Sequence, residues 1–181
     1  MADPDHNNLS LYRRTLGESF DSLPPVLQRF HDTPGGAIAE GSFRITWGQG
    51  WLRQALATGM RLPLPGEQVP ALVQVRTKGD MEYWTRDFGS RRLVSRQWLR
   101  QGLLVETAGP FRIGFKVSTD ATGMRFAFVR CWLFLLPLPN ALAPRVHGWV
   151  TEHENGWWVQ VGIELPVLGL LTQYEGKVTP R

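Results

Sequence analysis

The sequence predicts a mainly β (α+β) fold: a strongly curved antiparallel meander that forms a barrel or half-barrel, with short N-terminal helices and one helix after the first strand. From Glu67 onward apolar residues recur with a period of two, as they do in strands. Short glycine-containing turns, of which Asn155-Gly156 is the clearest, separate these segments and join antiparallel neighbours. No long helical crossover interrupts them, which disfavours a parallel sheet. About eight such strands cannot stay flat with open edges, so we expect the sheet to curl.

The chain begins with a segment, residues 1–33, that we expect to be helical. Apolar residues recur at helical spacing over 9–16 and again over 23–30. The Pro-Pro pair at 24–25 suits the first turn of the second helix, and Ser22 is placed to cap it.

The sheet is expected to span residues 37–178, within a single domain of residues 1–181, a length typical of one domain. Its first strand, 37–47, is followed by Gly48-Gln49-Gly50 and a helix over 51–58. The remaining strands are expected at 68–77, 81–88, 91–98, 102–107, 111–119, 124–135, 145–153, 157–165 and 170–178.

Composition argues against several classes of protein. The net charge of +4 comes from 20 Lys and Arg against 16 Asp and Glu, and the cations are spread along the chain. Nucleic-acid binders carry dense basic stripes, so we expect no nucleic-acid partner. The single cysteine, Cys131, excludes an internal disulfide and indicates a reducing compartment. No signal peptide is visible, and the longest apolar run, 131–139, is far shorter than the roughly 20 residues of a membrane helix. We therefore expect a cytoplasmic protein that does not span a membrane.

The stretch EYWTRDFGSRRLVSRQW, residues 82–98, interleaves arginines with aromatic residues and is expected to form a hairpin around Gly89-Ser90. A two-residue turn there pairs Asp87 with Arg92 on a solvated surface, where Asp87 is an ion-pair partner rather than a catalytic group. The opposite surface carries Trp84, Arg86, Phe88, Leu93 and Ser95. An arginine is therefore expected among large apolar side chains.

The strand at 124–135 repeats this pattern. Strict alternation places Met124, Phe126, Phe128, Arg130, Trp132 and Phe134 on one face. The other face carries Arg125, Ala127, Val129, Cys131 and Leu133. Arg130 is then expected between Phe128 and Trp132, and Cys131 is expected to be a packed thiol on the opposite side.

An arginine inside an apolar lining is costly unless it is paired. Two explanations stay open. Each arginine could pair with a buried carboxylate, for which Glu106 and Glu164 are candidates, or reach the rim. Alternatively, Arg86 and Arg130 could hold the anionic or carbonyl end of a mostly apolar ligand. In that case the wall of the binding site would be formed by Trp84, Arg86, Phe88, Phe128, Arg130 and Trp132.

The sequence contains no complete motif for metal binding, dinucleotide binding or catalysis by a nucleophilic serine. Of the four histidines, His6, His31, His147 and His153, the last two lie about 20 Å apart on an extended strand. No Cys/His spacing supports zinc, so no metal is expected. Gly48-Gln49-Gly50 begins like a dinucleotide fingerprint, but Arg53 replaces the third glycine and no parallel βαβ unit follows. No serine lies in a Gly-x-Ser-x-Gly elbow. We expect no cofactor.

Five segments in order resemble a bacterial family of domains of unknown function: LYRRTLGESFDSLPPVL, WTRDFGSRRLVSRQ, LVETAGPFRIGFKV, LPLPNALAPRV and LPVLGLLTQYEGKV. The likeness covers about residues 11–176, and W-x-R-x-F-G (84–89) and P-L-P-x-x-L-A-P (137–144) are its most specific parts. Leu136, where the family favours glycine, and Lys177, where it favours apolar residues, depart from the pattern. The resemblance implies a stand-alone protein or a tail fused behind NAD(P)-binding reductase- or epimerase-like domains, and sometimes behind membrane segments. It supplies no catalytic residues.

Three functions are compatible with these observations. The leading hypothesis is a binding module for a hydrophobic small molecule or lipid with a polar or anionic end, held inside the curved sheet. The second is a cofactor-free cyclase or isomerase, which would need an inward carboxyl with a raised pKa, such as Glu106 or Glu164. The third is an interaction domain for a partner reductase-like protein, with Arg91, Arg92 and Arg96 as the docking face.

Overall fold

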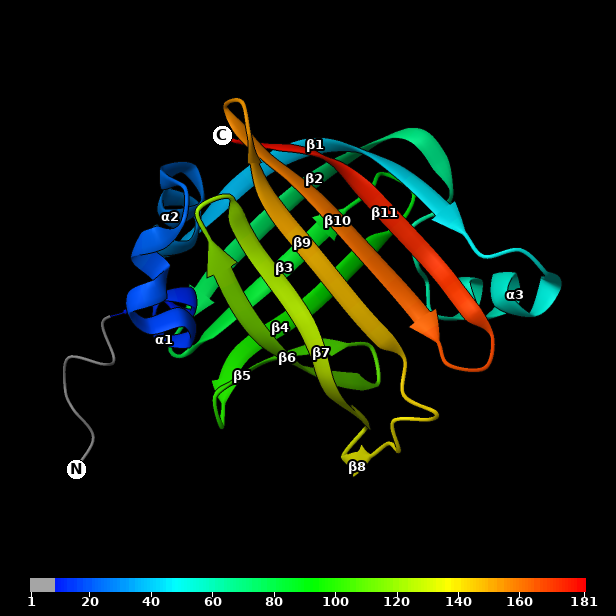
Figure 1. Cartoon of the computed structure of the whole chain (residues 1–181). Helices are drawn as coiled ribbons and strands as arrows, with labels where there is room; N and C mark the ends of the chain where they lie inside the picture. Colours follow the sequence, from blue (N-terminus) through cyan, green and yellow to red (C-terminus); the bar gives the residue numbers. More distant parts are fainter. Residues whose placement is uncertain (1–8) are drawn as a thin grey trace.

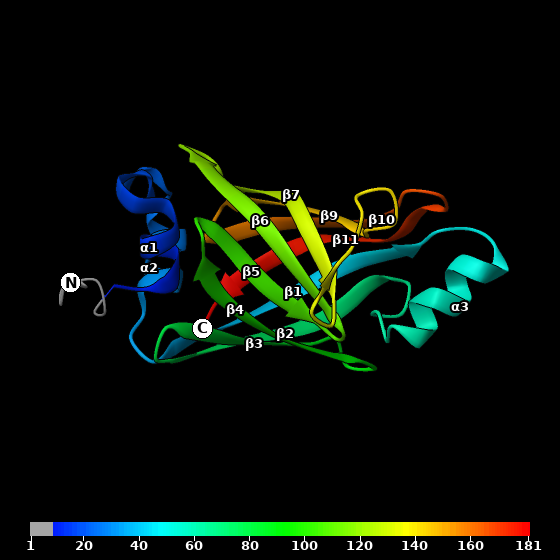
Figure 2. The same cartoon turned by 90° about the horizontal axis from the view of Figure 1, so that it is seen from below.

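The computed structural model describes residues 9–181, whose strands form one antiparallel sheet. The long strands are β1 (Gly36–Trp47), β2 (Gly66–Lys78), β3 (Met81–Asp87), β4 (Arg92–Arg100), β5 (Leu103–Ala108), β6 (Phe111–Asp120), β7 (Gly123–Leu133), β9 (Arg145–His153), β10 (Gly156–Leu165) and β11 (Gly169–Pro180). They are ordered β6-β5-β4-β3-β2-β1-β11-β10-β9-β7, and pairing of β6 with β7 closes the ring (Figures 1 and 2). The predicted antiparallel fold is confirmed, in its closed barrel form.

Each expected strand is present, and one short strand was not expected. The prediction continued the strand after Gly123 to residue 135, but β7 ends at Leu133 because Phe134 adopts a left-handed φ of 54°. The two-residue strand β8 (Leu136–Pro137) then turns back onto the end of β7.

Helices pack against one end of the barrel. They are α1 (Leu11–Leu16), the 3₁₀ helix η2 (Gly17–Ser22) and α2 (Pro25–Asp32), and their core side chains Leu11, Tyr12, Phe20, Leu27 and Phe30 are buried. Sequence spacing predicted the two α-helices but not η2. The expected cap at Ser22 was wrong: the first turn of α2 has no side-chain cap, and the Ser22 hydroxyl donates to the Ser19 carbonyl instead.

The helix expected after the first strand is α3 (Trp51–Gly59). No helix among residues 9–181 is both long enough and apolar enough to cross a membrane.

Neighbouring strands alternate in direction, so their connections alternate between the two ends of the barrel. The β2–β3, β4–β5, β6–β7 and β9–β10 turns lie at the end that carries α1 and α2, here called the capped end. The β1–β2, β3–β4, β5–β6, β7–β9 and β10–β11 connections lie at the other end, here called the α3 end. Figures 1 and 2 show α1 and α2 on one side of the barrel and α3 on the opposite side.

The β3–β4 hairpin has the register that the sequence predicted. Trp84 faces Ser95 and Asp87 faces Arg92 across the strands. The amide of Phe88 donates to the carbonyl of Arg91, which closes the two-residue turn at 2.9 Å. The expected surface ion pair is also present, with Arg92 Nη2 at 2.8 Å from Asp87 Oδ2.

A β-bulge breaks the alternation that was expected along β7. Gly114 of β6 pairs with Arg130, but the next residue, Phe115, pairs with Phe128, so Val129 is an extra residue in β7. The bulge reverses the facing of every residue that follows it. The expectation that Arg130 and Trp132 share the inner face with Phe128 was therefore wrong: Arg130 is exposed and Trp132 lies with it on the outer wall. Cys131, expected on the outer side, is in the core and 1% exposed.

Candidate functional site

The interior of the barrel, here called the lumen, holds four of the six residues predicted to form a binding wall. Trp84 and Phe88 are buried in the central hydrophobic cluster, Phe128 packs against that cluster while partly exposed, and Arg86 lies between Trp84 and Phe88 on β3. The guanidinium of Arg86 is 4.9 Å from the Trp84 ring centroid, close enough for a cation–π contact. Sequence alternation therefore placed these four side chains on the correct face of the sheet.

Arg86 is held by two partners from neighbouring strands. Its Nη1 donates to Ser95 Oγ of β4 at 2.9 Å and to Glu106 Oε1 of β5 at 3.1 Å. The Ser95 hydroxyl donates to the same carboxylate oxygen at 2.5 Å. The pairing of Arg86 with a carboxylate, and the choice of Glu106 as its partner, agree with the first of the two explanations left open by the sequence.

The rest of the guanidinium faces the lumen without a protein partner. Among residues 9–181 no acceptor binds Nε or Nη2 of Arg86. Neither nitrogen is sealed off, because in this range the one buried side-chain nitrogen or oxygen without a partner is Nε of Arg14. Arg86 therefore keeps donors that can bind an acceptor inside the barrel.

Burial and neighbouring charges shift the pKa values of Arg86 and of two nearby tyrosines, Tyr174 and Tyr12. Burial alone would lower the pKa of Arg86, but Glu106, Tyr174 and Tyr12 together raise it, so the guanidinium stays charged. Burial raises the pKa of Tyr174, although Arg86 opposes the shift. The pKa of Tyr12 is raised by burial and by the nearby Glu82 and Glu106 carboxyls. Both phenols are therefore neutral hydrogen-bonding groups at neutral pH.

Sequence reasoning missed a second polar group deeper in the lumen. Tyr12 of α1 donates to Gln97 Oε1 of β4 at 3.0 Å, and Glu82 faces Gln97 across the β3–β4 pair. The Glu82 carboxylate accepts a 2.9 Å hydrogen bond from Trp84 Nε1 and is only 2% exposed. Burial raises its pKa to about 7, against the lowering effects of Trp84 and Arg14. Period-two counting from Trp84 and Arg86 would have placed Glu82 on the inner face.

Replacing Glu82 with glutamine is expected to stabilise the protein above neutral pH. The folded-state pKa of Glu82 is about 7, above its ordinary value of 4.5, so ionisation of this carboxyl removes stability as the pH rises from about 4.5 to about 7. The full effect is about 3 kcal/mol. Glutamine keeps an acceptor for Trp84 but cannot ionise.

Chemical denaturation of both proteins between pH 4 and pH 9 tests this expectation. The stability advantage of Glu82→Gln should be absent near pH 4 and should grow to its maximum by pH 8. An advantage that does not change with pH would show that Glu82 ionises normally in the folded protein.

Several side chains that point inward from the barrel wall are only partly buried. Leu93, Phe126, Phe128, Val159 and Tyr174 pack against the buried cluster yet remain partly exposed. These side chains belong to the inner face of a closed sheet. Eight strands enclose an interior just wide enough to be filled by side chains or one small ligand, and a ten-stranded barrel is wider.

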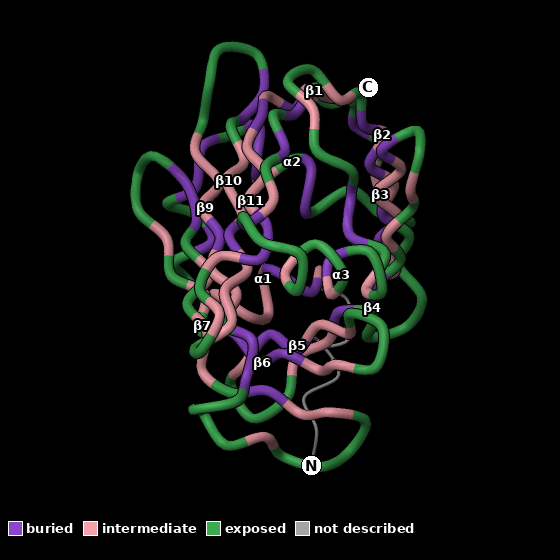
Figure 3. The backbone as a smooth tube through the Cα atoms, turned by 90° about the vertical axis from the view of Figure 1, so that its right-hand side faces the viewer, coloured by how far each residue is buried: buried purple, intermediate pink, exposed green. Residues whose placement is uncertain are grey.

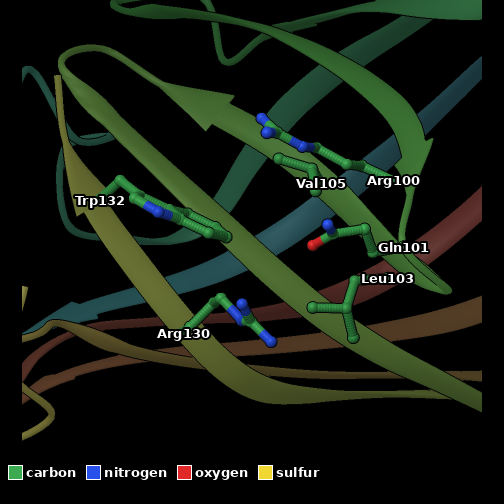
Figure 4. A pocket seen from close by; sticks show the side chains of 6 residues that line it. All are labelled: Arg100, Gln101, Leu103, Val105, Arg130 and Trp132. Atoms are coloured by element: carbon green, nitrogen blue, oxygen red, sulfur yellow. The ribbon is translucent and has the colours of Figure 1, made fainter. Parts of the chain in front are cut away.

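Arg130 and Trp132 contribute to a separate hollow on the outer wall. It has a volume of about 200 Å³ and is lined by Arg100, Gln101, Leu103, Val105, Arg130 and Trp132 (Figure 4). Gly114 borders the hollow, and a β-carbon there would lie 3.3–3.5 Å from the side chains of Leu103, Arg130 and Trp132. Pockets for drug-sized ligands measure about 300–1,000 Å³, so this hollow is too small to take one. No ion pair involves Arg130 within residues 9–181.

A larger groove of about 700 Å³ lies at the capped end, between α2, β1, β2 and the end of β11. Arg29, Arg76 and Arg181 line it together with apolar side chains such as Phe30 and Ile38. Arg181 is already paired with Glu40 by two hydrogen bonds. Arg86, Ser95 and Glu106 are not among the residues that line this groove.

Other candidate residues lie apart from the lumen. His153 and His147 are on β9, where His147 packs 5.0 Å from the Trp149 ring, and His6 lies outside the described residues. Burial raises the pKa of the Cys131 thiol to about 11, which makes it a poor nucleophile. In the part of the chain that the structure describes, no three His, Cys, Asp or Glu side chains are grouped to hold a metal ion.

The three arginines proposed as a docking face do not form one free cationic surface. Arg92 is paired with Asp87. Arg91 donates to the Leu62 carbonyl at 2.7 Å and lies over the Trp47 ring. Only Arg96 of the three keeps an exposed side chain with no ion pair among residues 9–181.

Comparison with known proteins agrees with the resemblance seen in the sequence. No curated protein matches this chain. The family model for a domain of unknown function (DUF4166) matches residues 23–178, a range that begins just before α2 and ends in β11. The matched range contains all of the barrel wall except the last two residues of β11, and it includes Arg86, Glu106 and Glu82. The chain therefore belongs to the DUF4166 family.

Proposed function

We propose that the barrel is a binding module for a hydrophobic small molecule or lipid whose polar end carries a hydrogen-bond acceptor. The observation that carries this proposal is Arg86, a charged side chain fixed inside an aromatic lumen with Nε and Nη2 left without a protein partner. Trp84, Phe88 and Phe128 provide the apolar surface around it. Ligand sites of this kind are mostly apolar with a few placed polar groups.

The apolar lining of the lumen and the polar group at Arg86 contribute differently to ligand binding. Burial of the ligand's apolar part supplies most of the affinity, at roughly 25 cal/mol for each Å² removed from water. Arg86 fixes the orientation of the polar end. Because Glu106 already balances its charge, the guanidinium does not need an anion, and a carbonyl or a carboxylate would serve as the acceptor.

Replacing Arg86 with methionine is expected to weaken ligand binding about tenfold or more, because one charge-assisted hydrogen bond contributes roughly 1.5–3 kcal/mol. The measurement is titration with long-chain fatty acids, fatty aldehydes and isoprenoid ketones, followed by tryptophan emission and native mass. Arg130→Met is the matched control, since Arg130 lies outside the barrel, and it should bind as the wild type does. No bound species across the panel, or equal losses in the two variants, would contradict the proposal.

Cofactor-free catalysis is the second candidate function, and Glu82 is the observation that favours it. A buried carboxyl with a pKa of about 7 can accept or donate a proton at neutral pH. Glu106 is less suited to that role because its carboxyl group already accepts hydrogen bonds from Arg86 and Ser95. Chromatography of the bound ligand after prolonged incubation separates the candidates: an enzyme returns an isomer that Glu82→Gln does not form, and a binding module returns the ligand unchanged.

A further inference from the structure

Large apolar side chains are exposed in the connections at the α3 end of the barrel. The most exposed are Trp51, Phe134, Leu135, Leu136, Leu142 and Val167, with 63–82% of each residue accessible. They come from three separate connections: the one that contains α3, the one that contains β8, and the β10–β11 turn. Figure 3 views the molecule from the α3 side and shows that much of these connections is exposed. Exposed apolar groups that cluster in this way usually mark an interaction surface.

The turns at the capped end have no such side chains. They are Gly79-Asp80, Gln101-Gly102, Ala121-Thr122 and Glu154-Asn155, all small or polar. Connections at both ends of a barrel meet water, so solvent exposure alone would have produced similar compositions. The apolar side chains are therefore a property of one end.

Charge is distributed unequally between the same two ends. The connections at the α3 end span residues 48–65, 88–91, 109–110, 134–144 and 166–168. They contain no Asp or Glu, and their charged residues are Arg53, Arg61 and Arg91. The capped end carries both signs of charge: Glu18, Asp21, Asp32, Asp80 and Glu154, together with Arg13, Arg14 and Arg29 of the helices. The connections of the α3 end are thus free of carboxylates, and Glu67 and Asp87, at the strand ends beside them, are paired with Arg44 and Arg92.

We propose that the α3 end docks on the surface of an anionic lipid bilayer. Trp51, Leu135, Val167 and the neighbouring apolar side chains would enter the boundary between headgroups and acyl chains, where aromatic and aliphatic side chains bind favourably. Arg53 and Arg61 would lie among the anionic headgroups. The lack of carboxylates favours a negatively charged lipid surface over a protein partner, whose interface would commonly offer both signs of charge. This inference stands independently of any ligand in the lumen.

Flotation of the full chain with vesicles tests the docking surface. We expect it to float with vesicles of phosphatidylcholine mixed with phosphatidylglycerol, more weakly with phosphatidylcholine alone, and less as salt rises. The double variant Leu135→Ser/Val167→Ser should bind anionic vesicles about tenfold or more weakly. Arg61→Glu should cause a loss of about tenfold or more on anionic vesicles and little change on neutral ones.

Matched variants on the barrel wall serve as controls. Ile38→Ser/Val94→Ser removes two exposed aliphatic side chains from β1 and β4, and Arg96→Glu reverses an exposed arginine on β4. Both should keep wild-type vesicle binding, and all four variants should keep the wild-type circular dichroism. Failure of the wild type to float with either vesicle, or equal losses in the controls, would overturn the docking surface. Ligand titration in the absence of lipid vesicles remains a separate test of the lumen.

Discussion

Replacing Glu106 with alanine is expected to lower the free energy of unfolding by about 3–5 kcal/mol. The variant leaves the Arg86 guanidinium inside the barrel without its counter-charge and leaves the Ser95 hydroxyl without its acceptor. Both side chains of the Arg86–Glu106 pair are only 19% exposed, so water cannot fully replace the lost carboxylate. Removing one partner of a buried pair costs more than the pair itself contributes, because the remaining charge is uncompensated.

Two further variants make this expectation specific. Glu67→Ala removes the partner of Arg44 in an exposed ion pair and should cost less than about 1 kcal/mol. The double variant Arg86→Met/Glu106→Leu removes both charges and should recover most of the stability lost in Glu106→Ala. Urea denaturation of the set at neutral pH is the measurement. Similar small losses in Glu106→Ala and Glu67→Ala would show that Arg86 is well solvated in the lumen.

Acid is expected to destabilise the protein through His31, by about 5 kcal/mol in full. Burial lowers the pKa of His31 to about 3, from an ordinary value of 6.5. Its ring packs 3.8 Å from Tyr12 and also contacts Phe30 and Trp84, so a charged imidazole is unfavourable there. The unfolded chain binds a proton below about pH 6.5, and the folded protein does so only near pH 3. Stability is therefore present above pH 6.5 and is lost as the pH falls toward 3.

His31→Phe keeps the aromatic packing and removes this proton, so its stability should exceed that of the wild type increasingly as the pH falls below 6.5. Glu82 acts in the opposite sense over an overlapping range, because its ionisation destabilises the protein as the pH rises from about 4.5 to about 7. The wild-type profile between pH 4.5 and 6.5 should consequently be flatter than that of either variant. A His31→Phe profile parallel to the wild type would contradict the account of His31.

The sequence predicted best those features that depend on nearby residues. Glycine-containing turns and period-two alternation located the long strands, and the Gly89-Ser90 turn alone set the register that places Trp84, Arg86 and Ser95 inside. The bulge at Val129 could not be predicted from nearby residues in the same way. It arises where β7 pairs with β6, a contact between strands, and a single extra residue reversed the facing of Arg130 and Trp132.

Features that depend on closure of the barrel could also not be predicted from the sequence. The pairing of β1 with β11 joins residues far apart in the chain, and no local pattern distinguishes a closed ring from a half-barrel. Tyr12 reaches Gln97 only because α1 packs on the capped end. Glu106 was identified as a partner for an inward arginine, but Glu164 was not used in this way: it lies opposite Arg145 in the β9–β10 pair.

A crystal structure with a dibrominated long-chain fatty acid tests the central claim most directly, because bromine locates the ligand by anomalous scattering. We expect bromine peaks inside the barrel beside Phe128, with the carboxylate within hydrogen-bond distance of Nε or Nη2 of Arg86. Bromine found only on the outer wall near Trp132 or in the groove beside α2, with the lumen closed over by its own side chains, would contradict a luminal binding site.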